Sequence, residues 1–220
     1  PTTTAYQYLI LLKLREKEEY YFKIKQHYFE HFKQIDPPSA FRIHMHMIGY
    51  CADCYNFKGD RRFTAEAHEL FKHSYVNERV TCGELLYPDF VNYIKVFSRA
   101  SDTALAREFI SDYSSKLPAD QYDNCINFSL AYISHYEGEL KNALKYVSMV
   151  NFPLAIMKVQ VRILQVQLNY QLQYFEETRS LVESFKKSLV KEVIISDLYT
   201  NSIMGFLKAV ITMISIKEET

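Results

Sequence analysis

Two stretches of the sequence repeat the same residue classes at an offset of 34 positions, without a gap in the register. The matched positions are apolar or aromatic: Leu130 with Leu164, Leu140 with Tyr174, and Val147 with Leu181. A fixed period of this length is typical of helix-turn-helix repeats, in which one helix pair cannot bury its apolar face alone and stacks on the next. The offset therefore predicts an all-α chain of antiparallel helix pairs.

The better of the two stretches, residues 130 to 150, has small residues where two helices must approach closely. Ala131 and Ala143 leave room for close packing, and Gly138 between them can take the positive φ that ends a helix. Residues 140 to 145 then resume an apolar period of three to four. This pattern resembles the tetratricopeptide repeat (TPR), which implies an α-solenoid of stacked helix pairs.

Weaker copies of the pattern flank this repeat. Cys51-Ala52 and Gly59 keep its spacing, and the next helix is expected from about Phe63. Residues 90 to 113 supply a further pair, in which Ser101 or Asp102 can cap the second helix. The copy that follows the best repeat keeps its apolar positions but replaces the small and turn residues by Gln165, Leu172 and Glu177. Recognisable repeats thus cover residues 38–188, and the arrangement resembles a group of uncharacterised bacterial TPR-like proteins, which implies no particular activity.

The two ends of the chain fit the same architecture. Residues 4 to 34 predict a helical hairpin or a bent helix, which Pro37 stops. Residues 192–216 predict a C-terminal capping helix, because a solenoid needs its last apolar face covered. Polar residues interrupt this segment before about 20 clean apolar residues accumulate, so we expect no membrane span. Residues 1–220 are expected to form a single TPR-like domain; since the chain begins at Pro1, either an initiator Met was removed or a longer protein contains it.

Residues 158 to 168 carry a competing signal, because apolar and polar residues alternate there as in a β-strand. The repeat register instead places a first helix between Pro153 and a turn near Leu172. A lone strand among helical repeats would have no sheet to join. We therefore expect a helix over this segment.

The composition limits the class of partner and the cellular compartment. Lys and Arg number 26, as do Asp and Glu, so no net positive charge favours nucleic acid. The few glycines and prolines suit a nearly all-helical chain, and no secretory segment opens it, so a cytoplasmic location is expected. Four cysteines do not make a disulfide framework in a chain of this kind: Cys51, Cys54, Cys82 and Cys125.

Two clusters of His and Cys look like metal sites at first. His44, His46, Cys51 and Cys54 lie close in sequence, but on a helix His46 is turned about 200 degrees from His44, so the four cannot converge. We expect ordinary buried side chains there.

The segment His27-Tyr28-Phe29-Glu30-His31 resembles the His-x-x-Glu-His motif of inverzincin metalloproteases, with Glu108 at a sequence distance resembling that of the third ligand. A metal-dependent hydrolase using His27, Glu30 and His31 is thus an alternative. The resemblance covers five residues, and separate repeats would hold Glu108 far from the two histidines. No phosphate-binding or nucleophile motif occurs elsewhere, so we expect neither an enzyme nor a cofactor.

The resemblance to TPR proteins implies a protein or peptide partner in the concave face of the solenoid, which the first helix of each pair lines. Transferred to this sequence, the family's partner-binding positions are Asp53, Asn56, Phe57, Phe128, Tyr132, His135, Tyr136, Arg162, Val166, Asn169 and Tyr170. Such a face mixes aromatic and hydrogen-bonding groups, which suits an extended peptide. The alternative partner is single-stranded nucleic acid stacked on the aromatic rings, which would also need a basic groove.

Overall fold

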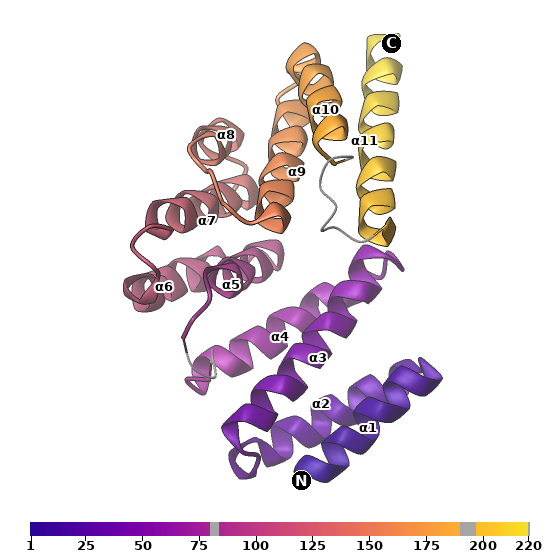
Figure 1. The fold of residues 1–220 in the computed structure, drawn as a ribbon, viewed down its shortest axis with the longest axis vertical. Coiled ribbons are helices and arrows are strands. Elements are labelled where there is room, and N and C mark those ends of the chain that lie inside the picture. Colours follow the sequence, from indigo (N-terminus) through magenta and orange to yellow (C-terminus); the bar gives the residue numbers. More distant parts are fainter. Residues whose placement is uncertain (80–83, 190–196, 220) are drawn as a thin grey trace. The chain divides into compact units, whose positions relative to one another are not determined.

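The structure is a computed structural model that describes residues 1–79, 84–189 and 197–219. Within these residues all regular structure is helical, as predicted (Figure 1). The eleven α-helices are α1 (Thr2–Arg15), α2 (Glu18–His31), α3 (Pro37–Asn56), α4 (Arg62–Val76), α5 (Tyr87–Arg99), α6 (Thr103–Tyr113), α7 (Tyr122–Tyr136), α8 (Leu140–Ser148), α9 (Ala155–Gln171), α10 (Phe175–Leu189) and α11 (Asp197–Glu218).

The chain divides into two compact units, Pro1–Leu85 and Leu86–Thr220. In the first unit α1 packs on α2, α3 packs on α4, and α3 also contacts both α1 and α2. In the second unit each helix packs on the next, and α5 also packs on α7. Helix packing is thus sequential within each unit, while the arrangement of the whole chain as one elongated domain stays a prediction.

A helical hairpin, rather than a bent helix, occupies the start of the chain. Glu16 takes a left-handed conformation with φ 52°, and its N–H donates to the Leu12 carbonyl, which ends α1. Pro37 stops the preceding segment as expected, but it also begins α3, since a proline at the first helical position loses no hydrogen bond. The Asp36 carboxylate caps this helix by accepting from the Ser39 N–H at 3.0 Å.

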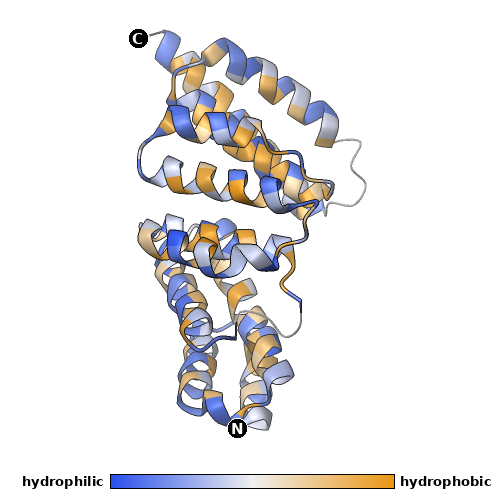
Figure 2. Ribbon diagram, turned by 90° about the vertical axis from the view of Figure 1, so that its left-hand side faces the viewer, coloured by the Kyte–Doolittle hydropathy of each residue, from blue (hydrophilic) through white to orange (hydrophobic). Residues whose placement is uncertain are grey.

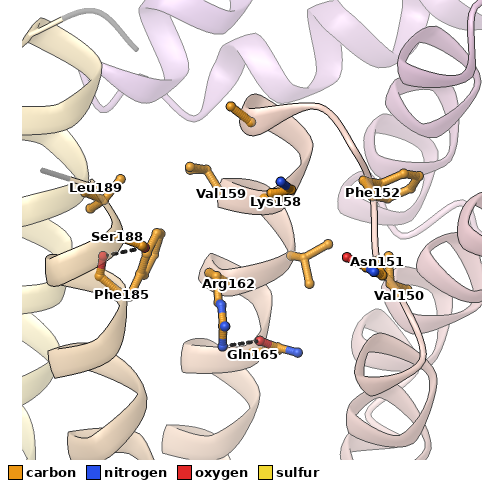
Figure 3. Close-up of a pocket in the computed structure, with 12 residues that line it drawn as sticks. Val150, Asn151, Phe152, Lys158, Val159, Arg162, Gln165, Phe185, Ser188 and Leu189 are labelled. Carbon is orange, nitrogen blue, oxygen red and sulfur yellow. Dashed lines mark hydrogen bonds between the residues drawn. The ribbon is translucent and has the colours of Figure 1, made fainter. Parts of the chain in front are cut away.

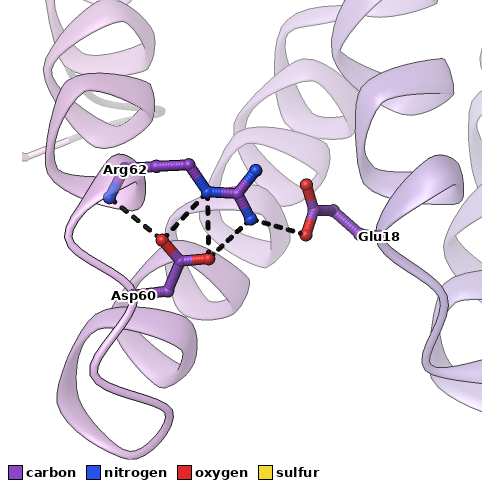
Figure 4. A network of polar contacts seen from close by, with 3 residues as sticks. All are labelled: Glu18, Asp60 and Arg62. Atoms are coloured by element: carbon purple, nitrogen blue, oxygen red, sulfur yellow. Dashed lines mark hydrogen bonds and ion pairs between the residues drawn. The ribbon is translucent and has the colours of Figure 1, made fainter.

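The long turn between α3 and α4 is held by an ion-pair network (Figure 4). Gly59 has a φ of +69°, and the Asp60 N–H returns to the Cys54 carbonyl at 3.0 Å. Asp60 also accepts from the Arg62 guanidinium at 2.7 Å, and Arg62 reaches Glu18 on α2 at 3.1 Å. Helix α4 follows this turn and begins at Arg62, within one residue of the expected start near Phe63.

The best-matched repeat packs as its sequence predicts. Ala131 on α7 and Ala143 on α8 are fully buried, and these two helices pack on each other. Gly138 has a φ of +82° between them. Asp102 is the N-cap of α6, where its carboxylate accepts from the Leu105 N–H at 3.2 Å. Residues 158 to 168 lie inside α9, so the strand-like alternation is overridden by packing.

Helix α11 ends the described chain and covers α9 and α10. Four of its residues form a buried stripe with apolar residues of those two helices: Ile203, Leu207, Val210 and Ile214. Residues 192–196 of the predicted capping helix lie outside the described residues. By length and composition α11 is long and apolar enough to cross a membrane, as judged over the part of the chain that the structure describes. Hydrophobic and hydrophilic residues alternate along the helices, as the two colours in Figure 2 show.

Candidate partner-binding surface

Side chains from the first helices of three successive pairs meet in the second unit. The Lys95 ammonium on α5 donates to the Gln160 Oε1 on α9 at 2.7 Å. The same ammonium lies 5.7 Å from the centre of the Tyr132 ring on α7, within the range of a cation–π contact. Lys95 thus joins α5, α7 and α9 through one charged group.

A second contact extends this surface toward the ends of α7 and α9. The His135 Nε2 and the Gln171 Oε1 are 2.9 Å apart. The rings of His135 and Tyr136 lie 5.2 Å apart, and Tyr136 is 38% exposed. We call these six residues the first-helix surface: Lys95, Tyr132, His135, Tyr136, Gln160 and Gln171.

Burial controls the protonation of this surface. Burial, and to a smaller extent the positive charge of Arg99 one turn later, together lower the pKa of Lys95 to about 7. Burial also raises the pKa of Tyr132 and lowers that of His135, although the hydrogen bond with Gln171 partly opposes the second change. Near neutral pH these environments favour the uncharged forms of the side chains. Because the pKa of Lys95 is about 7, its protonated and neutral forms are then present in similar amounts.

Several predicted binding residues lie elsewhere in the second unit. Phe128 and Val166 are fully buried, and Phe128 packs against Tyr132 and Phe152 with ring centres 5.1 and 5.5 Å apart. Asn169 donates to the carbonyl of Gln165 in its own helix at 2.8 Å. The Tyr170 ring lies 5.0 Å from the Lys217 ammonium and packs with α10 and α11. These side chains stabilise the fold and do not join the first-helix surface.

Arg162 lines a separate cavity of about 270 Å³ between α9, α10 and the segment after α8 (Figure 3). Its guanidinium donates to the Gln165 side chain at 3.4 Å. The cavity has a mixed lining: Val150, Asn151, Phe152, Ala155, Lys158, Val159, Val161, Arg162, Gln165, Phe185, Ser188 and Leu189. Arg162 therefore faces a different side of α9 from Gln160.

The remaining predicted binding residues, Asp53, Asn56 and Phe57, belong to the first unit. All three are exposed at the C-terminal end of α3. The carbonyl of Asp53 accepts from the Phe57 N–H at 2.9 Å, which closes the last turn of that helix. Their role in binding stays a prediction.

Of the first candidate metal cluster, three residues are buried side chains of α3. Burial lowers the pKa of His44 to about 4, and the Cys51 thiol donates to the Tyr21 hydroxyl at 3.3 Å. Cys54 is also buried, whereas His46 is exposed, and Cys82 lies outside the described residues. Over the described ranges, no three His, Cys, Asp or Glu residues are grouped so that they could hold a metal ion.

The protease-like segment lies on α2 with its two histidines one turn apart. The rings of His27 and His31 have centres 4.5 Å apart, and the His27 Nε2 is 2.8 Å from the Pro1 carbonyl oxygen. Glu30 accepts from Gln26 at 2.8 Å. Glu108 lies on α6, which belongs to the other compact unit.

Lys95, Gln160 and Gln171 were not among the residues predicted from the sequence to form this surface. The available signal for Lys95 was its position inside the dense apolar segment 90 to 97, where a lysine is unexpected on a buried helix. Gln160 and Gln171 carry no comparable signal, since glutamine is ordinary on a half-exposed helix.

Comparison with known proteins adds no identity to this geometry. The chain matches no protein-family model, no curated protein and no solved structure. It is an all-α protein with sequential helix packing over the residues that the structure describes.

Proposed function

We propose that the helix pairs stack as a TPR-like solenoid, which binds a protein or peptide partner through the first-helix surface without catalysis. The observation that carries the proposal is the junction of α5, α7 and α9 through Lys95, Tyr132 and Gln160. The 34-residue offset and the sequential packing support the solenoid, because stacked repeats contact chiefly their neighbours. In this proposal the protein acts in the cytoplasm, and α11 packs on α9 and α10 through its buried stripe rather than crossing a membrane.

The chemistry of the surface suits an extended peptide. Such a peptide presents a backbone N–H and C=O at every residue, and both need partners when they are buried. The amides of Gln160 and Gln171 and the ring of His135 can supply donors and acceptors. Tyr136 offers a large, partly apolar ring with few rotatable bonds, which is typical of residues that dominate binding energies.

A single-stranded nucleic acid is the alternative partner, since a base could stack on the exposed ring of Tyr136, next to the buried Tyr132 that contacts Lys95. That mode requires a basic groove that follows many phosphates. The balance of 26 basic and 26 acidic residues favours a peptide instead.

Peptide display with the full chain tests the proposal. Peptides of about ten residues selected on the wild-type protein should bind Tyr136→Ala at least about tenfold more weakly, because an interface tyrosine that dominates binding often contributes more than 1 kcal/mol. Tyr174→Ala is the matched control, since Tyr174 is equally exposed at 38% but lies between α9 and α10. Equal weakening in both variants, or no selected peptide, would contradict the proposal.

A further inference from the structure

Lys95 places an amino group, which is positively charged when protonated, in a half-buried position where its observed partners are neutral. Its ammonium contacts the Gln160 amide oxygen at 2.7 Å and the Tyr132 ring at 5.7 Å. Within the described ranges of the chain, no carboxylate forms an ion pair with it. Removing a charge from water without an opposite charge is costly, so folding alone does not explain this lysine.

The surroundings of Lys95 increase that cost. Arg99 lies one turn further along α5, and its positive charge opposes protonation of Lys95. The neighbouring residues Val91, Ile94 and Phe97 are buried, so an apolar side chain such as methionine would suit the same helix. A negative group from outside could pair with the Lys95 ammonium, because a charge-assisted hydrogen bond is strongest where water is excluded.

We propose that Lys95 binds a carboxylate of the partner, the side chain of an Asp or Glu in an extended peptide. Gln160 and Tyr132 hold the ammonium at the point where α5, α7 and α9 meet, and Arg99 adds positive potential beside it. This inference rests on the proposed function and names the chemistry that the partner must carry.

A carboxylate fits this place better than a nucleic-acid phosphate. A nucleic acid repeats its charge at every nucleotide and needs a row of cations along the strand. Lys95 offers one ammonium, held by the Gln160 amide and the Tyr132 ring. One acidic side chain is enough to pair with this charge. Two exposed cations of α9, Lys158 and Arg162, line the cavity beside α10 rather than the surface around Lys95.

Paired peptides test the inference with the full chain. Peptides of about ten residues selected by display are synthesised with Glu or with Gln at each acidic position, and their affinities are measured by calorimetry. The Glu versions should bind wild type about tenfold or more tightly than the Gln versions. Lys95→Met should reduce this ratio to about one, whereas Lys158→Met, which removes an exposed lysine of the same unit, should leave it unchanged.

Each contrary result has a distinct meaning. Selected peptides without acidic residues, equal binding of Glu and Gln versions, or a ratio that survives Lys95→Met would overturn the inference while the proposed function stands. Failure to select any peptide would overturn both. Tight binding of a short oligothymidine that depends on Lys95 would replace the carboxylate by phosphate.

A second measurement does not depend on the folding of the variant. Acetylation of Lys95 in the wild-type chain, followed by mass spectrometry, should slow when the Glu peptide is bound and remain unchanged with saturating Gln peptide. Equal protection by the two peptides would show that the carboxylate does not contact Lys95.

Discussion

Lys95 should have opposite effects on stability and on binding. Its pKa of about 7 in the folded protein lies below the value of about 10.4 expected in the unfolded chain. Between these values the unfolded chain binds more protons, so this lysine makes stability rise with pH, and its cost is fully present below about pH 7. Among the described residues, the ammonium contacts the Gln160 amide and the Tyr132 ring, and the charge of Arg99 one turn later acts on it. Burial raises the pKa of Tyr132, which therefore stays neutral over this range.

We therefore expect Lys95→Met to be more stable than wild type below about pH 7, by on the order of 1–2 kcal/mol after allowance for partial exposure. The difference should shrink as the pH rises and disappear near pH 10. Urea unfolding of both proteins across this range measures it. Lys158→Met, at an exposed site, should show no such trend. A variant that is less stable than wild type at every pH would mean that the Lys95 contacts stabilise the fold.

The periodicity of the sequence shows which residues share one side of a helix, but not how deeply that side is covered. Phe128, Tyr132 and Tyr136 follow one another at four-residue spacing on α7, yet Phe128 is fully buried and Tyr136 is 38% exposed. The difference arises because neighbouring elements cover the start of this stripe, as Phe152 does for Phe128. Depth of burial depends on such tertiary neighbours, which no spacing rule within one helix contains.

At the scale of elements, the end of α7 depends on the conformation of one glycine. The Gly138 N–H donates to the His135 carbonyl and the Glu139 N–H to the Ser134 carbonyl, the two bonds of a Schellman motif. Gly138→Ala should destabilise the protein by about 1–2 kcal/mol, because a side chain disfavours the observed φ of +82°.

Gly49 provides the matched control inside α3. It lies in the helix interior, and an added Cβ would meet no atom within 4 Å. Gly49→Ala should therefore stabilise the protein by about 0.5–1 kcal/mol, since alanine favours the helix. Thermal unfolding of the two variants should move in opposite directions. If both variants melted at a lower temperature than wild type, the folded protein would lack the space for a side chain at position 49 that the structure shows.

The sequence predicted helices best where apolar periods, glycines and caps agreed, as at Asp102 and Gly138. It did not locate the break after α1, because Glu16 adopts the left-handed conformation without being a glycine. A charged run such as 15 to 19 has no strong local preference, and the hairpin forms because α1 and α2 then bury their apolar sides against each other and α3. Packing decided this turn, whereas local chemistry decided the turns at Gly59 and Gly138.

At the scale of the whole molecule, each compact unit has a buried apolar cluster of its own. In the first unit this cluster runs from α1 to α4 and includes Tyr21, Ile43 and Leu70. In the second unit α9, α10 and α11 share another, which includes Phe185 and Leu207. Separate clusters of this kind are what independently folding units need, yet a solenoid also gains stability wherever one repeat stacks on the next.

The stability of each unit alone and the stability gained by stacking can be separated by cutting the chain at the boundary between the units. We expect fragments 1–85 and 86–220 both to be helical by circular dichroism, because each retains its own buried cluster. If the repeats stack as a continuous solenoid, the full chain should also melt at a higher temperature than either fragment, since the junction contributes a nearest-neighbour term. A mixture of the two fragments, which lacks only the covalent link, is the control for effects of fragment ends. Melting of the full chain as the simple sum of its fragments would contradict the solenoid and leave two independent helical domains.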